Sequence, residues 1–199
     1  MRDLHLWAFE RGTLWAYERD ADDAAPVQSR LAAIYAEARP NRTDALAEAM
    51  GLADASEVAR RFSGGRRCFV VEVDGSIAAY GWVSQGSEYI GELERAFHMP
   101  PNEAYIWDCA TLPRYRGQRL YCALLSHIMA TFRREGVRRI WIGASLQNTP
   151  SIRAFATAGF EPVLDLVYVR LLAFRHIWLR RHPTVSPELF TRARQALTS

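Results

Sequence analysis

Three arginines surround one glycine in the stretch Pro-Arg-Tyr-Arg-Gly-Gln-Arg-Leu-Tyr, residues 113–121, which runs directly into an apolar pattern of helical spacing. The first N–H groups of a helix have no backbone partner and carry partial positive charge, so anions bind there. Gly117 allows a ligand to approach the backbone closely. Arg114, Arg116 and Arg119 add full positive charges. The stretch therefore predicts a site for a phosphate-bearing ligand, with an arginine-rich turn that merely caps a helix as the alternative.

A second stretch, Asn-Thr-Pro-Ser-Ile-Arg-Ala-Phe-Ala-Thr-Ala-Gly-Phe, occupies residues 148–160. Together the two stretches resemble the GNAT superfamily of acyl-CoA-dependent N-acyltransferases. The first resembles its pyrophosphate loop, Arg/Gln-x-x-Gly-x-Gly/Ala, and the second is similar to its Asn-led helix that ends in Gly-Phe. The resemblance covers roughly residues 105–163. It implies an α/β fold, namely a three-layer α/β/α sandwich with a mixed, mostly antiparallel central sheet.

The resemblance also implies acetyl-CoA as cosubstrate, no metal, and a set of residues that hold the coenzyme. The implied set is Cys109, Ala110, Thr111, Arg114, Arg116, Gly117, Gln118, Arg119, Leu120, Tyr121, Asn148, Ser151 and Phe155. A backbone N–H near residues 109–111 would meet the thioester carbonyl, and Asn148 would hold the pantetheine arm. Arg119 and Tyr121 replace small residues of the family's loop. Phe155 stands where many members have a tyrosine that protonates the leaving thiolate, and a phenyl ring has no such proton to give.

Asp108 is the leading candidate for the general base that takes the proton from an attacking amine. It lies between apolar neighbours in residues 105–111, which predicts a desolvated carboxylate. A structural hydrogen bond is the alternative role for Asp108. Glu72, Glu92 and Glu94 are weaker candidates on neighbouring predicted strands. Cys109 is interpreted as a small buried residue, because direct transfer from a thioester needs no acyl-enzyme.

The bulk composition favours an ordinary globular protein. The chain has 199 residues, of which 49% are apolar and 24% charged, and a net charge of +3 that gives no reason to expect nucleic acid as a partner. Three cysteines without a metal-type or disulfide-type spacing favour a reduced, cytoplasmic protein. No apolar run has the length of a membrane span, and the first residues lack the apolar core of a secretory signal. The sequence leaves a homodimer open.

The elements that must position these residues follow from local patterns. We expect a strand over residues 13–20, paired with residues 4–10 across Arg11–Gly12, and a hairpin with its turn at Asp74–Gly75. Thr149 is the expected N-cap of the helix in the second stretch. Helices are predicted over residues 26–40, over residues 43–62 with a break near Gly51, over residues 120–135 and 149–158, and in the tail. Strands are predicted over residues 87–97, 103–111 and 138–145. One or two more are predicted over residues 160–174, and a last strand is predicted before the tail. The predicted domains are 1–175, an N-acyltransferase domain, and 176–199, a C-terminal extension.

These observations favour an enzyme that moves an acetyl or short acyl group from coenzyme A to a primary amine of a small molecule. The alternative is a non-catalytic acyl-CoA-binding module that acts as a sensor, which Phe155 and the altered loop would suit. A nucleic-acid-binding domain is a third, weaker hypothesis, because the chain has neither a basic tract nor a recognition-helix pattern.

Overall fold

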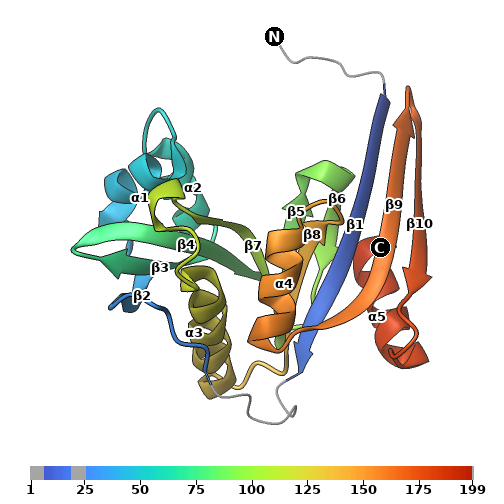
Figure 1. Ribbon diagram of the computed structural model, residues 1–199. Coiled ribbons are helices and arrows are strands. Elements are labelled where there is room, and N and C mark those ends of the chain that lie inside the picture. The colour runs from blue at the N-terminus through green and yellow to red at the C-terminus, as the bar shows by residue number, and fades with distance from the viewer. Residues whose placement is uncertain (1–6, 19–25, 199) are drawn as a thin grey trace.

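A single eight-stranded sheet forms the centre of the fold, and helices cover both of its faces (Figure 1). The computed structural model describes residues 7–18 and 26–198. Helices α3 and α4 lie on one face, and α1, α2 and α5 pack on the other, which confirms the predicted three-layer α/β/α sandwich. A two-stranded sheet, β5 with β6, adds to the α5 face.

The strands are β1 (Trp7–Glu18), β2 (Ile34–Ala38), β3 (Arg67–Val73), β4 (Ser76–Gln85), β5 (Ser87–Ile90), β6 (Arg95–His98), β7 (Glu103–Thr111), β8 (Arg139–Ser145), β9 (Glu161–Leu171) and β10 (Phe174–Arg181). The helices are α1 (Thr43–Met50), α2 (Ser56–Ser63), α3 (Leu120–Arg134), α4 (Thr149–Ala158) and α5 (Pro187–Thr198). Across the main sheet the order is β10-β9-β1-β8-β7-β4-β3-β2. Among the described strands, β7 and β8 form the one parallel pair, and the other neighbours are antiparallel.

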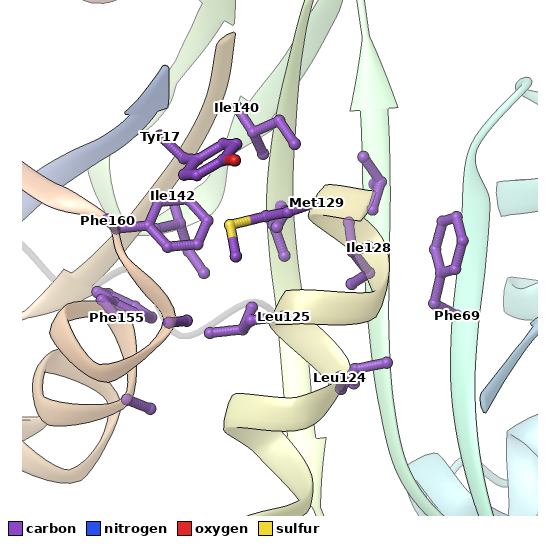
Figure 2. Close-up of a cluster of buried hydrophobic side chains, with 14 of the residues drawn as sticks. Tyr17, Phe69, Leu124, Leu125, Ile128, Met129, Ile140, Ile142, Phe155 and Phe160 are labelled. Carbon is purple, nitrogen blue, oxygen red and sulfur yellow. The ribbon is translucent and has the colours of Figure 1, made fainter. Parts of the chain in front are cut away.

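The core between the sheet and helices α3 and α4 holds these elements in place. Figure 2 shows Leu125 and Met129 of α3 pointing toward Phe155 of α4 and toward Ile140 and Ile142 of β8. Four of these side chains are at most 2% exposed, and Met129 is 7% exposed. Because burying a side chain of this size is worth about 1.5–3 kcal/mol, this contact fixes both helices against the strands that flank the site.

Several local predictions are confirmed. The turn at Asp74–Gly75 joins β3 to β4, and Gly51, with φ +68°, ends α1 before α2 begins. Helix α3 occupies the predicted range, and β9, β10 and the tail helix α5 are present. Residue 175, the predicted domain limit, lies inside β10, which pairs with β9 along its whole length.

The predicted helix over residues 26–40 is wrong. Residues 34–38 instead form β2, which pairs with β3 at the edge of the sheet. Leu31, Ala33 and Tyr35 alternate toward the α3 side, so their spacing also satisfies a period of two. Backbone groups of residues 27 and 30 bond to α3 and to the loop before it, which provides hydrogen-bond partners that a helix would otherwise supply.

The predicted hairpin across Arg11–Gly12 is also wrong. Residues 7–18 are one continuous strand that lies between β8 and β9, while residues 4–6 and 19–20 of the prediction lie outside the described residues. Gly12 lies within the strand and allows β8 and β9 to pack closely against it. A methyl group there would lie 3.3 Å from the Ala144 carbonyl oxygen and 3.4 Å from the Leu166 side chain. The strand predicted over residues 87–97 is interrupted by a turn at residues 91–94, where Glu94 has φ +50°.

Candidate active site

A cleft opens in the sheet between β7 and β8. The two strands pair through four residues each, residues 103–106 with residues 139–142. Beyond these residues β7 stays beside β4 and β8 stays beside β1, so the strands diverge. The resulting cleft has a volume of about 900 Å³.

The cleft is lined from both faces of the sheet. Tyr121 of α3 and Phe155 of α4 line it on one face. Leu93, next to β6, and Leu197 of α5 line it on the opposite face. A ligand on one face can therefore meet a ligand on the other inside the sheet.

A β-bulge shapes the β7 wall of the cleft. Asp108 and Cys109 together lie opposite Gly81 of β4, because the register shifts between the pairs on either side. Asp108 has φ +41°. The Cys109 sulfur packs so close to Gly81 that a methyl group there would lie 2.9 Å from it. The bulge thus turns Asp108 outward and directs Cys109 toward α3.

Asp108 is held by an ion pair with Arg61 of α2, and its side chain is 33% exposed. Arg61 lies between the rings of Trp82 and Trp107, at 5.1 and 4.7 Å from their centroids, and also bonds Glu57 at 3.0 Å. The carboxylate is therefore charge-paired and partly hydrated, in contrast to the desolvated side chain that its apolar neighbours predicted.

The other candidate carboxylates differ in whether they line the cleft. Glu72 bonds Arg42 and does not line the cleft. Glu94 forms ion pairs with Arg170 and Arg175, at 3.1 and 3.2 Å. Glu92 does line the cleft, on the face of α5 and the β5–β6 hairpin.

The arginine-rich loop is built as a helix N-terminus with exposed backbone. After a short 3₁₀ turn at Pro113–Tyr115, Gly117 has φ +77° and Arg119 has φ +60°, and α3 begins at Leu120. The backbone N–H and the side chain of Arg30 bond the carbonyl oxygens of Gln118 and Gly117, at 2.9 and 3.2 Å. Since a trans peptide directs its N–H opposite to its carbonyl, the N–H groups of Gln118 and Arg119 face away from Arg30.

The side chains of Arg114, Arg116 and Arg119 are all exposed around this loop. Arg116 reaches back to the Thr111 carbonyl oxygen at 3.3 Å, at the end of β7. A methyl group at Gly117 would meet no atom within 4 Å, so open space lies over the loop. This combination of free amides, open space and arginines suits a diphosphate.

Tyr121, Cys109 and Phe155 meet where the cleft passes between the two helices. The Tyr121 and Phe155 rings are 6.4 Å apart in an edge-on arrangement, and the Tyr121 phenol lies beside the Cys109 thiol. Burial raises the pKa of the Tyr121 phenol well above its ordinary value and raises the pKa of the Cys109 thiol to about 12. Both groups therefore keep their protons at neutral pH.

Asn148, rather than the predicted Thr149, caps α4: its side-chain oxygen accepts a hydrogen bond from the Ser151 N–H at 3.3 Å. Asn148 and Ser151 both line the cleft. Eight of the predicted coenzyme residues do not line it: Ala110, Thr111 and Leu120, and the loop residues Arg114, Arg116, Gly117, Gln118 and Arg119. Ala110 packs toward α1 and α2, Leu120 is buried in the core, and Thr111 has a buried hydroxyl without a protein partner.

Sequence reasoning missed the β1 and β5 side of the cleft. Glu10 and Arg11 of β1 and Tyr89 of β5 line it. These residues carry no local motif, and only the pairing of distant strands brings them to the site. Within the described residues, no group of His, Cys, Asp and Glu is arranged to hold a metal ion. None of the described helices combines the length and the apolarity that crossing a membrane would need.

The model of the acetyltransferase (GNAT) family matches residues 30–160, which include the loop, the bulge and α4. The chain belongs to the GNAT family. No curated protein matches the chain by sequence.

Solved structures share the GNAT fold at low sequence identity. A GCN5-related N-acetyltransferase from Sphaerobacter thermophilus aligns with a TM-score of 0.60 and 16% identity, over 88% of this chain and 53% of its own. An acetyltransferase of the GNAT family from Colwellia psychrerythraea aligns with a TM-score of 0.54 and 13% identity, over 88% of this chain and 57% of its own. This GNAT protein thus spans little more than half the length of both.

A third solved structure, from Salmonella typhimurium, contains acetyl-CoA as its cofactor. It aligns with a TM-score of 0.51 and 21% identity, over 65% of this chain and 80% of its own. At these identities the three structures bear on the fold of this GNAT protein alone.

Proposed function

We propose that this protein transfers an acetyl or short acyl group from coenzyme A to a primary amine of a small molecule, by direct attack of the amine on the thioester. The observation that carries the proposal is the cleft that passes through the sheet between β7 and β8, with the loop of exposed amides beside one mouth. Holding the two reactants on opposite faces and letting them meet in the opening would supply proximity and orientation.

The chain's own residues would divide the work. The N–H groups of Gln118 and Arg119, with the neighbouring arginine side chains, would bind the diphosphate, and Asn148 and Ser151 would lie along the pantetheine arm. The backbone at the bulge would orient the thioester. Cys109 would not act as a nucleophile, because its thiol, whose pKa burial raises to about 12, stays protonated.

Asp108 is our proposed acceptor for the amine's proton, since it lies in the cleft at the bulge. Glu10 and Glu92 would attract an ammonium group to the α5 face. We also propose residues 1–175 as the acyltransferase domain and residues 176–199 as an extension that closes the acceptor side through Leu197.

Release of free thiol from acetyl-CoA, measured with a panel of small amines, tests the transfer. We expect Asp108→Asn to lower kcat by about 10²-fold or more while coenzyme affinity is unchanged, since general base catalysis contributes 10²–10⁴-fold. Glu92→Gln is the comparison, because Glu92 is a second carboxylate of the cleft. A larger loss of kcat in Glu92→Gln than in Asp108→Asn would assign the role of general base to Glu92.

A non-catalytic acyl-CoA-binding module is the second candidate, favoured by Phe155, which offers no proton at the α4 wall of the cleft. Coenzyme binding by calorimetry without turnover of any amine would support this candidate. Absence of heat with coenzyme A and with its thioesters would refute both candidates.

A further inference from the structure

The transfer proposed above leaves a thiolate in the cleft, and Phe155 cannot protonate it. We propose that Tyr121, at the start of α3, donates its phenolic proton to the leaving sulfur of coenzyme A. This inference rests on the proposed function, and it assigns a catalytic role to a residue that replaces a small residue of the family's loop.

The position of Tyr121 suits this role. It lies in the first turn of α3, directly after the loop proposed to bind the diphosphate, and its ring meets Phe155 of α4 at 6.4 Å. Both rings line the cleft on the coenzyme face, where β7 and β8 diverge. The phenol therefore reaches the same part of the cleft from α3 that residue 155 reaches from α4.

The phenol of Tyr121 lies beside a sulfur atom, that of Cys109. The Cys109 thiol has one hydrogen, which it donates to the Trp107 carbonyl oxygen at 3.4 Å. The Cys109 sulfur therefore offers the neighbouring phenol a lone pair and no hydrogen. A thiolate that forms in the cleft would be a stronger acceptor than this neutral sulfur, so the phenol would turn to it.

The place of Cys109 follows from the fold. The bulge at Asp108 directs the Cys109 side chain toward α3, and Gly81 leaves the space that its sulfur occupies. Gly81, Cys109 and Tyr121 thus follow one another in space, which places the phenol beside the bulge before any ligand binds.

The other phenols that line the cleft are less suited. Tyr89 is 60% exposed at the β5 rim. Tyr105 lies on the opposite face of the sheet, with its ring 5.1 Å from that of Phe97. Among the lining residues that the structure describes, Tyr121 is the phenol on the coenzyme face.

The step balances without another reactant. The amine nitrogen forms a bond to the acyl carbon, the carbon–sulfur bond breaks, and the phenolic proton passes to sulfur to give coenzyme A. The amine's proton passes to Asp108 or to water, and the phenolate regains a proton from solvent after product release. Burial raises the pKa of the phenol well above its ordinary value, so the donor is protonated at neutral pH when each cycle begins.

The test compares Tyr121→Phe with the double variant Tyr121→Phe/Phe155→Tyr, using acetyl-CoA and an amine that the wild-type protein acetylates. We expect Tyr121→Phe to lower kcat by about 10²-fold or more with little change in coenzyme affinity, in line with the contribution of a positioned acid. The double variant, which returns a phenol to the same part of the cleft from α4, should recover a large part of this loss.

Tyr17→Phe is the matched control, because Tyr17 is a buried tyrosine that contacts Phe160 outside the cleft. It removes a tyrosine hydroxyl away from the cleft and should leave kcat unchanged. A kcat for Tyr121→Phe within threefold of wild type, or an equal loss in Tyr17→Phe, would overturn the role of Tyr121 alone. Failure of the wild-type protein to acetylate any amine would instead overturn the proposed function.

Discussion

The ion pair between Glu103 and Arg139 gives the sharpest stability prediction. The two residues begin β7 and β8 and are register partners, at the closed end of the cleft. Their side chains are 2% and 5% exposed, with the guanidinium 2.5 Å from one carboxylate oxygen. The Trp141 indole N–H donates to the other oxygen at 2.6 Å, and Glu18 is a second partner of Arg139.

Replacing Glu103 by Leu leaves a buried guanidinium and a buried indole N–H without this partner. Breaking a buried ion pair from one side costs about 3–5 kcal/mol. In a chain of this size, each kcal/mol shifts Tm by about 2–4 °C, so the expected decrease in Tm is about 6–20 °C. Urea denaturation followed by tryptophan fluorescence and circular dichroism would measure the free energy of unfolding.

Glu18→Gln is the matched control. It removes the other carboxylate partner of Arg139, but the Glu18 side chain is 35% exposed, so we expect a cost of about 1 kcal/mol or less. The double variant Glu103→Leu/Arg139→Met should recover most of the stability lost in Glu103→Leu, because no buried charge is left. Equal and small costs for Glu103→Leu and Glu18→Gln would refute the reasoning that burial determines the effect.

Three further predictions concern single positions. Gly81→Ala places a methyl group 2.9 Å from the Cys109 sulfur, so it should lower the free energy of unfolding, measured by urea denaturation, by about 1–3 kcal/mol. Adding Cys109→Ala to the same chain should restore most of this loss. Burial lowers the pKa of His127, so the folded protein favours the neutral ring. Because the unfolded chain then binds more protons in acid, Tm should be highest above pH 6.5 and should fall as the pH decreases toward 5. A His127→Gln variant whose Tm falls with the same slope would contradict this cause. Gly117→Ala strains a residue with φ +77° by about 1–2 kcal/mol, so it should weaken coenzyme binding, measured by calorimetry, about 5- to 30-fold. Gly136→Ala is the control, because Gly136 also has a positive φ, +84°, but lies beyond the far end of α3. It should change the stability of the protein but not its affinity for the coenzyme.

The conformation of the arginine-rich loop could be predicted from sequence because its determinants are local. A glycine with positive φ, arginines and the start of a helix all lie within a few residues, and the same holds for the turn at Asp74–Gly75. The predicted helix over residues 26–40 failed because a short apolar segment can satisfy either period, and the exposed edge of β3 decided in favour of a strand.

The surroundings of the candidate base could not be predicted in this way. The partner of Asp108, Arg61, is 47 residues away and lies on a helix with no motif of its own. The stacking of Arg61 between Trp82 and Trp107 depends on which strands are neighbours. The same reason explains why Glu10 and Tyr89 were missed, since long-range pairing brings them to the cleft.

Because the strands part after only four residue pairs, the cleft has two separate entrances, one on each side of the sheet. Neither reactant would have to depart before the other arrives, and neither would obstruct the other's route. The geometry is therefore compatible with random order of addition through a ternary complex. The entrance on the α5 face could then change in evolution, through β1, β5 or α5, without rebuilding the entrance beside α3 and α4.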